Sequence, residues 1–373
     1  MSDSHKVPIA AVAFPTAALV LVMTVVFAQS WLERAPAWLT TYALPLLATV
    51  LLIGCVFAAL QHAEVVGERV GEPFGTLTLT LSVTIIEVAL VASMMLNDEN
   101  NPTLAREAVF SVVIIVCTGL TGLCLFIGAL RHYEQDIQPQ GTSAYLTVIM
   151  ALAVTTLVLP NYTETTPGPI YSTGQLIFVS VASILLYGAF LFVQTVRHRS
   201  DFAELPHSTT LPGAAHARPS GRAAFIALVG LLASLLCVIL LAKKVAAGVE
   251  SGLAQLPLKR PDAIAGAVIA MLVLMPEGLA AVRAAARNAL QTSVNIALGS
   301  ALATIGLTIP AVTAVSVVST RPIVLGLDPR DQVLLWLTFA ISVVSFGTGH
   351  TNVLSGMVHL VVFATFVLFL FSP

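Results

Sequence analysis

The chain contains, at residues 78–95, the stretch TLTLSVTIIEVALVASMM, which has the length and composition of a membrane-spanning helix. Glu87 is the one charged residue in it and falls near its middle. A second glutamate, Glu277, occupies a similar apolar run at 267–282, AVIAMLVLMPEGLAAV. A carboxylate at the centre of a transmembrane helix costs about 2.5–3.5 kcal/mol on insertion scales. Two such carboxylates therefore indicate a function that needs them.

The composition is that of a membrane protein. Of the 373 residues, 57% are hydrophobic and 10% are charged, and the mean hydropathy is +0.93. Soluble domains carry about 25% charged residues. Apolar runs of about 20 residues, long enough to cross a hydrocarbon core, recur along the chain. The short alternating segments of a β-barrel are not seen. We therefore expect an all-α polytopic membrane protein.

Hydropathy predicts about eleven transmembrane helices. Their predicted ranges are 7–29, 37–61, 76–96, 104–130, 142–159, 173–196, 222–246, 264–282, 292–317, 332–346 and 354–371. The first run is long for a cleaved signal peptide, so we interpret it as a leading transmembrane helix. A polar connection rich in Pro, Gly, Ser and His, RHRSDFAELPHSTTLPGAAHARPSGR (197–222), divides the series into halves.

The predicted organisation is a leading helix followed by two inverted five-helix repeats. The parts are a leading transmembrane helix at 1–35, a first repeat at 36–196, a cytoplasmic linker at 197–221 and a second repeat at 222–373. Because five is odd, the second repeat enters the membrane from the opposite side, as in many secondary transporters. The linker arginines favour a cytoplasmic linker and N-terminus, although Lys/Arg residues at 243–260 reduce that bias.

Hydroxyl side chains accompany Glu87. Thr76, Thr80 and Thr84 precede it at spacings of four, four and three, which places all of them on one helical face. The hydroxyls either line a binding site or bond back to carbonyls of their own helix. No lysine or arginine within a predicted span is placed to pair with either central glutamate.

Pro276 directly precedes Glu277. A proline inside a helix removes one hydrogen bond and frees the carbonyl of Leu272. A freed backbone oxygen beside a carboxylate suits a hard cation. The alternative is a kink that serves packing alone.

The helix after each glutamate supplies a second polar face. In the second half, hydroxyls repeat at every fourth position: Ser300, Thr304 and Thr308. In the first half, Ser111 and Thr118 are seven residues apart, and Gly119 and Gly122 permit close helix approach. We expect these helices to line a cavity beside the glutamates.

Other titratable groups lie closer to the predicted helix ends. Glu64, Glu68, Glu72 and Glu250 are either solvated charges or a mouth that concentrates cations and relays protons. His359, inside the last predicted span, is either a proton carrier or a hydrogen-bonded structural residue. The four cysteines lie in apolar runs without a C-x-x-C pair, so we interpret them as small apolar packing residues.

Two segments, 71–93 (GEPFGTLTLTLSVTIIEVALVAS) and 275–312 (MPEGLAAVRAAARNALQTSVNIALGSALATIGLTIPAV), resemble the signature segments of calcium/proton exchangers, specifically the bacterial ChaA-type antiporters. The resemblance implies that Glu87 and Glu277 bind cation or protons in turn, and that Glu64 and Glu250 serve cation access. The Gly-Asn pair usual before each glutamate is replaced by Val83-Thr84 and by Val273-Leu274. These replacements alter the expected ligand set.

The predicted function is secondary cation/proton antiport across the bacterial inner membrane, without a cofactor. The transported ions are expected to be Ca²⁺ and H⁺, and a Na⁺ or K⁺/H⁺ antiporter is the alternative. The sequence contains no phosphate-binding loop of the kind that would indicate ATP hydrolysis. His62, His350 and His359 form no metal cluster for an intramembrane enzyme. With a net charge of −2 and no basic block, nucleic-acid binding is not expected.

Overall fold

The computed structural model describes residues 13–21, 36, 39–70, 82, 84–89, 91–92, 95, 102–204, 219–254, 260–319 and 321–373. The chain divides into two compact units. The first unit comprises Met1–Glu99 and His216–Pro261, and the second comprises Asn100–Ala215 and Asp262–Pro373.

The first unit is built on two long helices, α3 (Leu44–Val70) and α9 (Gly221–Ala254), which pack along each other. A π-helical turn, η1 (Leu39–Ala43), leads into α3. The buried ring of His62 on α3 lies against Gly230 on α9, so the glycine permits the close approach.

Both helices continue past the predicted apolar runs. The span predicted at 37–61 extends to Val70, and the span predicted at 222–246 extends to Ala254. The helices can continue because neither residues 62–70 (HAEVVGERV) nor residues 247–254 (AGVESGLA) contain a proline, which would stop a helix. Glu64 and Glu68 therefore lie on a helix and not in a loop, and the backbone of Glu250 is helical as well.

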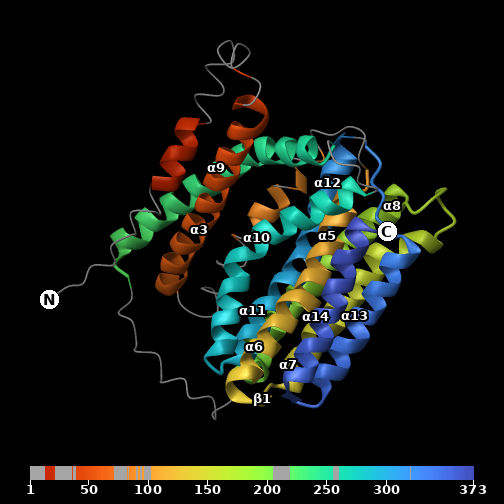
Figure 1. Cartoon of the computed structure of the whole chain (residues 1–373). Helices are drawn as coiled ribbons and strands as arrows, with labels where there is room; N and C mark the ends of the chain where they lie inside the picture. Colours follow the sequence, from red (N-terminus) through yellow and green to blue (C-terminus); the bar gives the residue numbers. More distant parts are fainter. Residues whose placement is uncertain are drawn as a thin grey trace. The chain divides into compact units, whose positions relative to one another are not determined.

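The second unit is a helical bundle with one short β-pair (Figure 1). Its elements are α5 (Leu104–Ile114), η2 (Ile115–Leu120), α6 (Thr121–His132), β1 (Gln135–Asp136), α7 (Pro139–Ala153), η3 (Val154–Val158), η4 (Leu159–Tyr162), α8 (Thr173–Phe192), η5 (Val193–Arg197), η6 (Arg199–Phe202), α10 (Pro261–Ala286), α11 (Leu290–Ala303), η7 (Thr304–Thr308), α12 (Ile309–Ser319), α13 (Pro329–Gly347), β2 (His350–Thr351) and α14 (Val353–Phe371). Elements η2, η3, η5 and η7 are π-helical turns that continue the preceding helix.

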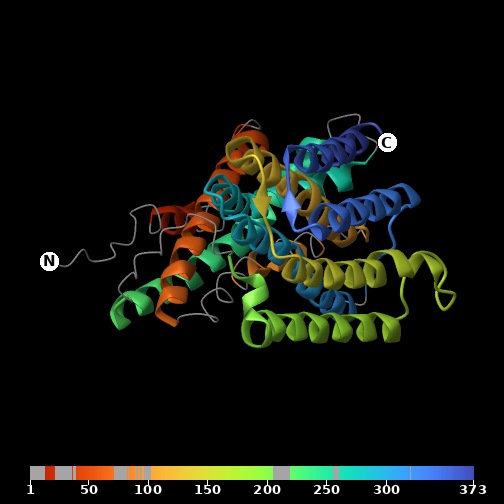
Figure 2. The same ribbon diagram turned by 90° about the horizontal axis from the view of Figure 1, so that it is seen from below.

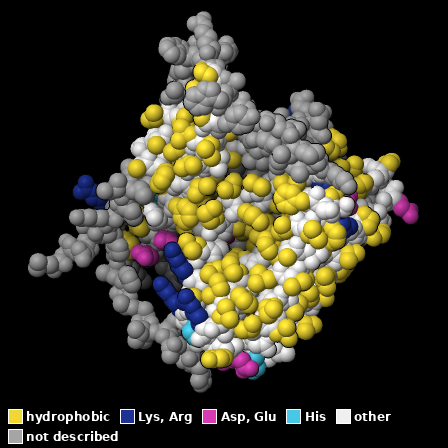
Figure 3. All heavy atoms as spheres, in the orientation of Figure 1, with side chains coloured by type: hydrophobic (Ala, Val, Ile, Leu, Met, Phe, Trp, Pro, Cys, Tyr) yellow, Lys and Arg dark blue, Asp and Glu magenta, His cyan; other side chains and the backbone are white. Residues whose placement is uncertain are grey.

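Seven of the described helices are long and apolar enough to cross a membrane, and the bent helix α10 would make an eighth. Hydrophobic side chains spread over the visible face of the bundle (Figure 3). The expectation of an all-helical membrane protein is therefore confirmed. The predicted spans at 7–29 and 76–96 lie largely outside the described residues, so the number eleven stays a prediction.

The β-pair joins two corners of the second unit. Strands β1 and β2 run antiparallel, with Asp136 opposite His350, and Figure 2 shows them side by side. The His350 Nδ1 atom lies 2.7 Å from Asp136 Oδ1. The α6–α7 corner is thereby tied to the α13–α14 corner.

Glycines allow α14 to pack closely on α6 and η2. A Cβ atom on Gly122 would lie 2.9 Å from the Cβ of His359, and one on Gly119 would lie 2.9 Å from the ring of Phe363. A Cβ atom on Gly356 would lie 2.6 Å from the backbone nitrogen of Phe126. The prediction that Gly119 and Gly122 permit close helix approach is confirmed.

Replacing Gly356 with alanine is expected to destabilise the protein by about 1–3 kcal/mol, because backbone atoms of α6 must move to admit the methyl group. The measurement is thermal unfolding of the purified protein in detergent. Gly188→Ala in α8 is the matched control, since a Cβ there meets nothing within 4 Å and alanine favours the helix. Equal melting temperatures for the two variants would contradict the close packing.

The first residues of the central linker dock on α11. The amide of Asn295 donates to the carbonyl of Phe202 at 2.7 Å. The backbone N–H and the hydroxyl of Thr292 both donate to the Glu204 carboxylate, each at 2.9 Å. A carboxylate at a helix N-terminus is stabilised by the helix dipole. The linker therefore contributes to holding α11, the helix that carries Ser300.

The four cysteines, Cys55, Cys117, Cys124 and Cys237, are all described, buried and free. Their burial without disulfide bonds agrees with the interpretation of these residues as packing residues.

Candidate functional site

Helix α10 bends where it presents Glu277. Its two parts, Ala263–Met275 and Glu277–Ala286, meet at 57°. The bend falls at Pro276, whose missing N–H leaves the helical ladder one hydrogen bond short. Glu277 is thus the first residue beyond the break.

The Glu277 side chain is buried, with 8% of the residue exposed, and it accepts a hydrogen bond from a neighbouring helix. The donor is the hydroxyl of Ser300 on α11, which bonds to Glu277 Oε2. Hydrogen bonds to an ionised carboxylate are among the stronger ones in proteins. Sequence analysis predicted both residues for the site, and the structure brings them together.

The hydroxyls that follow Ser300 enter a π-helical turn. Thr304 and Thr308 are the first and last residues of η7, and both are buried. The Oγ1 atom of Thr308 has no hydrogen-bond partner in the described part of the chain. A spacing of four residues keeps side chains close to one face in a π-turn as in an α-helix, so the shared polar face of the three hydroxyls stays a prediction. Such turns are frequent at functional sites.

Glu87 is buried in the first unit, with 5% of the residue exposed. Thr84, one turn earlier in the described stretch 84–89, is buried as well. Thr80 lies outside the described residues, as does the side chain of Glu250. Glu64 is exposed on α3.

The span after Glu87 also contains buried hydroxyls. Ser111 Oγ on α5 and Thr121 Oγ1 on α6 have no hydrogen-bond partner among the described residues. Thr118, in η2, bonds back to the carbonyl of Ile114 at 2.5 Å. Thr118 is therefore bonded within its own helix, while Ser111 remains available as a ligand.

His359 is fully buried, and both ring nitrogens have protein partners. Nδ1 lies 2.9 Å from the carbonyl oxygen of Cys117, and Nε2 lies 3.1 Å from the hydroxyl of Ser345. Of the two alternatives for His359, these contacts favour the hydrogen-bonded structural residue.

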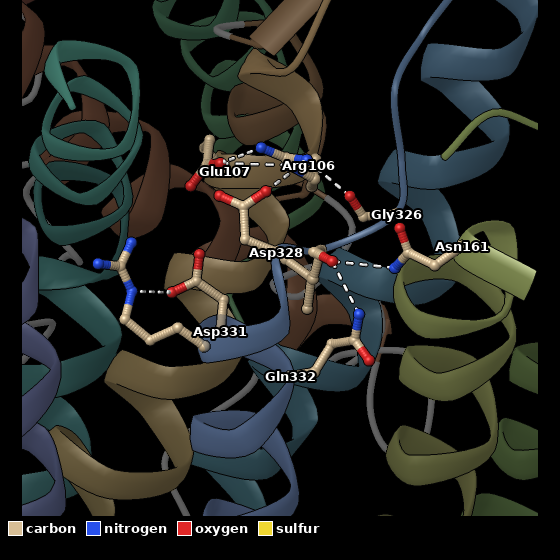
Figure 4. Close-up of polar contacts among 9 residues, drawn as sticks. Arg106, Glu107, Asn161, Gly326, Asp328, Asp331 and Gln332 are labelled. Carbon is tan, nitrogen blue, oxygen red and sulfur yellow. Dashed lines mark hydrogen bonds and ion pairs between the residues drawn. The ribbon is translucent and has the colours of Figure 1, made fainter. Parts of the chain in front are cut away.

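A buried charged cluster that the sequence-based predictions did not include lies at the start of α5 (Figure 4). The Arg106 guanidinium lies 2.7 Å from Glu107 Oε1 and 3.8 Å from Asp328 Oδ1. It also donates to the carbonyl of Gly326 at 2.6 Å. Arg106 and Glu107 are both nearly inaccessible to solvent. Arg106 lies within the predicted span 104–130, but its described partners are Glu107, Asp328 and Gly326 and neither central glutamate.

The cluster holds the extended segment that leads into α13. The amides of Asn161 and Gln332 both donate to the carbonyl of Leu327, at 2.9 and 2.8 Å (Figure 4). Arg330 Nε lies 3.6 Å from the buried Asp331. Two features of the sequence could have indicated this cluster. They are the adjacent charges Arg106 and Glu107 at the start of a predicted span and the charged segment DPRD (328–331).

The chemistry of the site suits a hard cation or a proton. Carboxylate, hydroxyl and carbonyl oxygens are the ligands that Ca²⁺ and other hard cations prefer. Among the described residues, no group of three or more His, Cys, Asp or Glu could hold a metal ion. A helical membrane bundle with a buried carboxylate at a helix break is the arrangement of a secondary cation transporter.

Comparison with known proteins agrees with that class. The sequence profile of the family described as sodium/calcium exchanger protein matches residues 40–196 and 226–372. These two stretches make up most of the chain, which therefore belongs to the sodium/calcium exchanger family. It is a multi-pass membrane protein, a secondary transporter that exchanges cations, and not an enzyme.

The chain is similar to two bacterial proteins over most of its length. It is 45% identical over 324 residues to the putative ionic transporter y4hA of Sinorhizobium fredii (strain NBRC 101917 / NGR234), which covers 87% of each chain. It is 34% identical over 354 residues to the sodium-potassium/proton antiporter ChaA of Escherichia coli (strain K12), which covers 95% of this chain and 94% of ChaA. The resemblance to ChaA-type antiporters is thereby confirmed.

Two solved structures share the fold. Native YfkE superposes with a TM-score of 0.70 at 17% identity, covering 96% of this chain and 100% of YfkE. The H⁺/Ca²⁺ exchanger CAX superposes with a TM-score of 0.69 at 13% identity, covering 97% of this chain and 89% of CAX. At these identities the likeness shows the fold alone, which is that of the CAX exchangers.

Proposed function

We propose that this protein is a cation/proton antiporter in which Glu87 and Glu277 bind the cation or protons in turn. The observation that carries the proposal is the buried Glu277 carboxylate beyond the bend in α10, bonded to Ser300. No lysine or arginine among the described residues pairs with Glu277, so a transported cation or a proton must balance its charge. The buried Glu87 supplies a second carboxylate in the first unit.

In the proposed mechanism, two carboxylates that bind the same ions account for obligatory exchange. Both ionised, they repel each other, so an empty site with two charges is disfavoured. A divalent cation neutralises the pair, and protons do the same. Cation and protons therefore exclude each other, and the neutralised forms change between inward and outward states most easily. A tenfold proton gradient supplies about 1.4 kcal/mol per proton.

The spacing of two π-helical turns supports the proposed internal repeat. A π-helical turn begins 28 residues after Glu87, at η2, and another begins 27 residues after Glu277, at η7. This spacing favours the organisation into a leading helix, repeats at 36–196 and 222–373, and a linker at 197–221. With eleven spans, the linker and the N-terminus would face the cytoplasm of a bacterial inner membrane.

Calcium is the proposed cation, and a monovalent cation is the alternative. Carboxylate pairs with hydroxyl and carbonyl oxygens suit Ca²⁺. The alternative is favoured by the relative ChaA, whose name states sodium-potassium/proton antiport. Thr84 and Ser300 complete the proposed ligand set. We propose that four further residues serve cation access to these ligands or proton relay: Glu64, Glu250, Thr80 and Thr304.

The test of this function is proton movement in everted vesicles that hold an acid-inside gradient. Ca²⁺, Na⁺ and K⁺ chlorides are added in turn, with choline chloride and vesicles lacking the protein as controls. Collapse of the gradient by Ca²⁺ supports calcium/proton antiport, and collapse by Na⁺ or K⁺ alone assigns the monovalent alternative. No response to any of these cations would overturn the proposed function.

Ser300→Ala is expected to raise the KM for the transported cation roughly tenfold and to change the maximal rate little. The alanine removes one hydroxyl that bonds to Glu277, and a hydrogen bond to a charged group contributes about 1.5–3 kcal/mol. The measurement is the initial exchange rate over a range of cation concentrations. Ser300→Thr, which keeps the hydroxyl, is the matched control, and an unchanged KM in Ser300→Ala would exclude Ser300 from the site.

A further inference from the structure

The imidazole of His359 supplies a donor to a backbone carbonyl in the middle of a transmembrane span. Its Nδ1 atom lies 2.9 Å from the carbonyl oxygen of Cys117, which is part of η2. A carbonyl oxygen can only accept, so Nδ1 carries a proton. The hydroxyl of Ser345, 3.1 Å away, can then donate to Nε2. A neutral ring therefore satisfies both contacts.

The carbonyl of Cys117 needs this donor because η2 is a π-helical turn. In a continuous α-helix, the N–H of Thr121 would donate to the carbonyl four residues earlier, that of Cys117. Here the Thr121 N–H bonds instead to the carbonyls of Val116 and Thr118. The Cys117 carbonyl loses its helical partner in a buried position, where an unpaired polar group is destabilising.

The same arrangement occurs at a second π-turn. At η3, the N–H of Leu159 bonds to the carbonyl of Val154 and leaves that of Thr155 without its helical donor. The hydroxyl of Tyr171 donates to the Thr155 carbonyl at 2.5 Å. In both turns, a side chain from elsewhere in the chain replaces the missing N–H. His359 differs in its origin, since it reaches η2 from α14, 242 residues along the chain from Cys117.

The turn determines how the polar side chains of this span are oriented. A π-turn accommodates one additional residue, so it rotates the residues beyond it by about 100° relative to a continuous α-helix. Ser111, before η2, and Thr121, after it, both have buried hydroxyls without a hydrogen-bond partner in the described ranges. In the other half, Ser300 precedes the corresponding turn η7 and bonds to Glu277.

We propose that His359 is a positioning residue for cation exchange. By capping the Cys117 carbonyl, it holds η2 in the π-helical form and so keeps Ser111 and Thr121 correctly oriented along the transport path. It does not carry a transported proton. This inference rests on the proposed antiport, because it assigns the hydroxyls of the α5–α6 span to the exchange pathway.

The test compares His359→Asn with His359→Leu. The two side chains have nearly the same size and branching, but asparagine can place an N–H close to the position of Nδ1 and leucine cannot. Neither can carry a proton at the pH of the assay. Exchange is measured in everted vesicles with the cation to which the wild-type protein responds, over a range of external pH. Ser345→Ala, which removes the partner of Nε2 alone, is the third variant.

The expected result is that His359→Asn and Ser345→Ala keep the wild-type pH profile, whereas His359→Leu exchanges roughly tenfold more slowly. Loss of exchange in His359→Asn, or a shifted pH profile in Ser345→Ala, would overturn the positioning role in favour of proton transfer. Equal activity of the asparagine and leucine variants would overturn it as well. If His359→Leu does not fold, the exchange rate and pH profile of His359→Asn alone test the positioning role. A wild-type protein that exchanges no cation would instead refute the proposed function.

Discussion

Replacing Glu277 with glutamine is expected to reduce cation-dependent proton exchange by at least about 30-fold. Glutamine keeps the size of the side chain and can still bond to Ser300. It removes the negative charge that balances the cation and the group that takes up the proton. Loss of one partner from a buried charge pair costs about 2–5 kcal/mol, which corresponds to a factor of roughly 30 or more. Exchange is measured as the collapse of an acid-inside gradient in everted vesicles.

Three further variants serve as comparisons and a control for Glu277→Gln. Glu87→Gln should lose exchange to a similar degree, because the mechanism needs both carboxylates. Glu277→Asp keeps the charge on a shorter side chain, so partial activity is expected. Glu134→Gln removes an exposed glutamate from the second unit and should exchange as the wild type does. If Glu277→Gln were as active as Glu134→Gln, the two-carboxylate site proposed here would be wrong.

Arg106→Met is expected to destabilise the protein by about 3–5 kcal/mol, the usual result of breaking a buried ion pair from one side. The guanidinium pairs with the buried Glu107 and donates to the carbonyl of Gly326. Methionine fills much of the volume but supplies neither a charge nor a donor. The extended segment before α13 should loosen first, because Arg106 is one of its anchors (Figure 4). Thermal unfolding in detergent measures the loss.

The control for Arg106 is Arg287→Met, which removes an exposed arginine of the same unit and should melt close to the wild type. The double variant Arg106→Met with Glu107→Met should recover part of the lost stability, since replacing both members of a buried pair is often nearly neutral. A melting temperature for Arg106→Met equal to that of Arg287→Met would show that the cluster does not stabilise the bundle.

Helix positions were predictable to within a few residues in the second unit. The span predicted at 104–130 is continuous from Leu104 to His132, and the one predicted at 354–371 is Val353–Phe371. Hydropathy succeeds here because a run that avoids water must be helical in a membrane. Hydropathy does not predict helix ends outside the apolar core, as at Val70 and Ala254, where no proline stops the helix and it continues in polar sequence.

The candidate site was predictable in part. Placing a carboxylate in an apolar membrane span costs free energy however the span packs. Glu87 and Glu277 could therefore be identified as candidate site residues from the sequence alone. The sequence predicted only that Glu277 and Ser300 line the same cavity. It did not predict their hydrogen bond, since which hydroxyl faces the carboxylate depends on how the helix is rotated. The π-turns at η2 and η7 carry no signal of their own, because they alter the backbone without requiring a particular residue.

The sequence by itself determined the class of this protein, a helical membrane transporter with two buried carboxylates, because hydropathy and isolated charges act locally along the chain. The tertiary structure decided which distant residues the buried polar side chains contact. It joined Arg106 to Gly326 across 220 residues and His359 to Cys117 across 242 residues. Contacts between distant residues depend on how helices rotate and pack, and that packing is decided by the whole bundle.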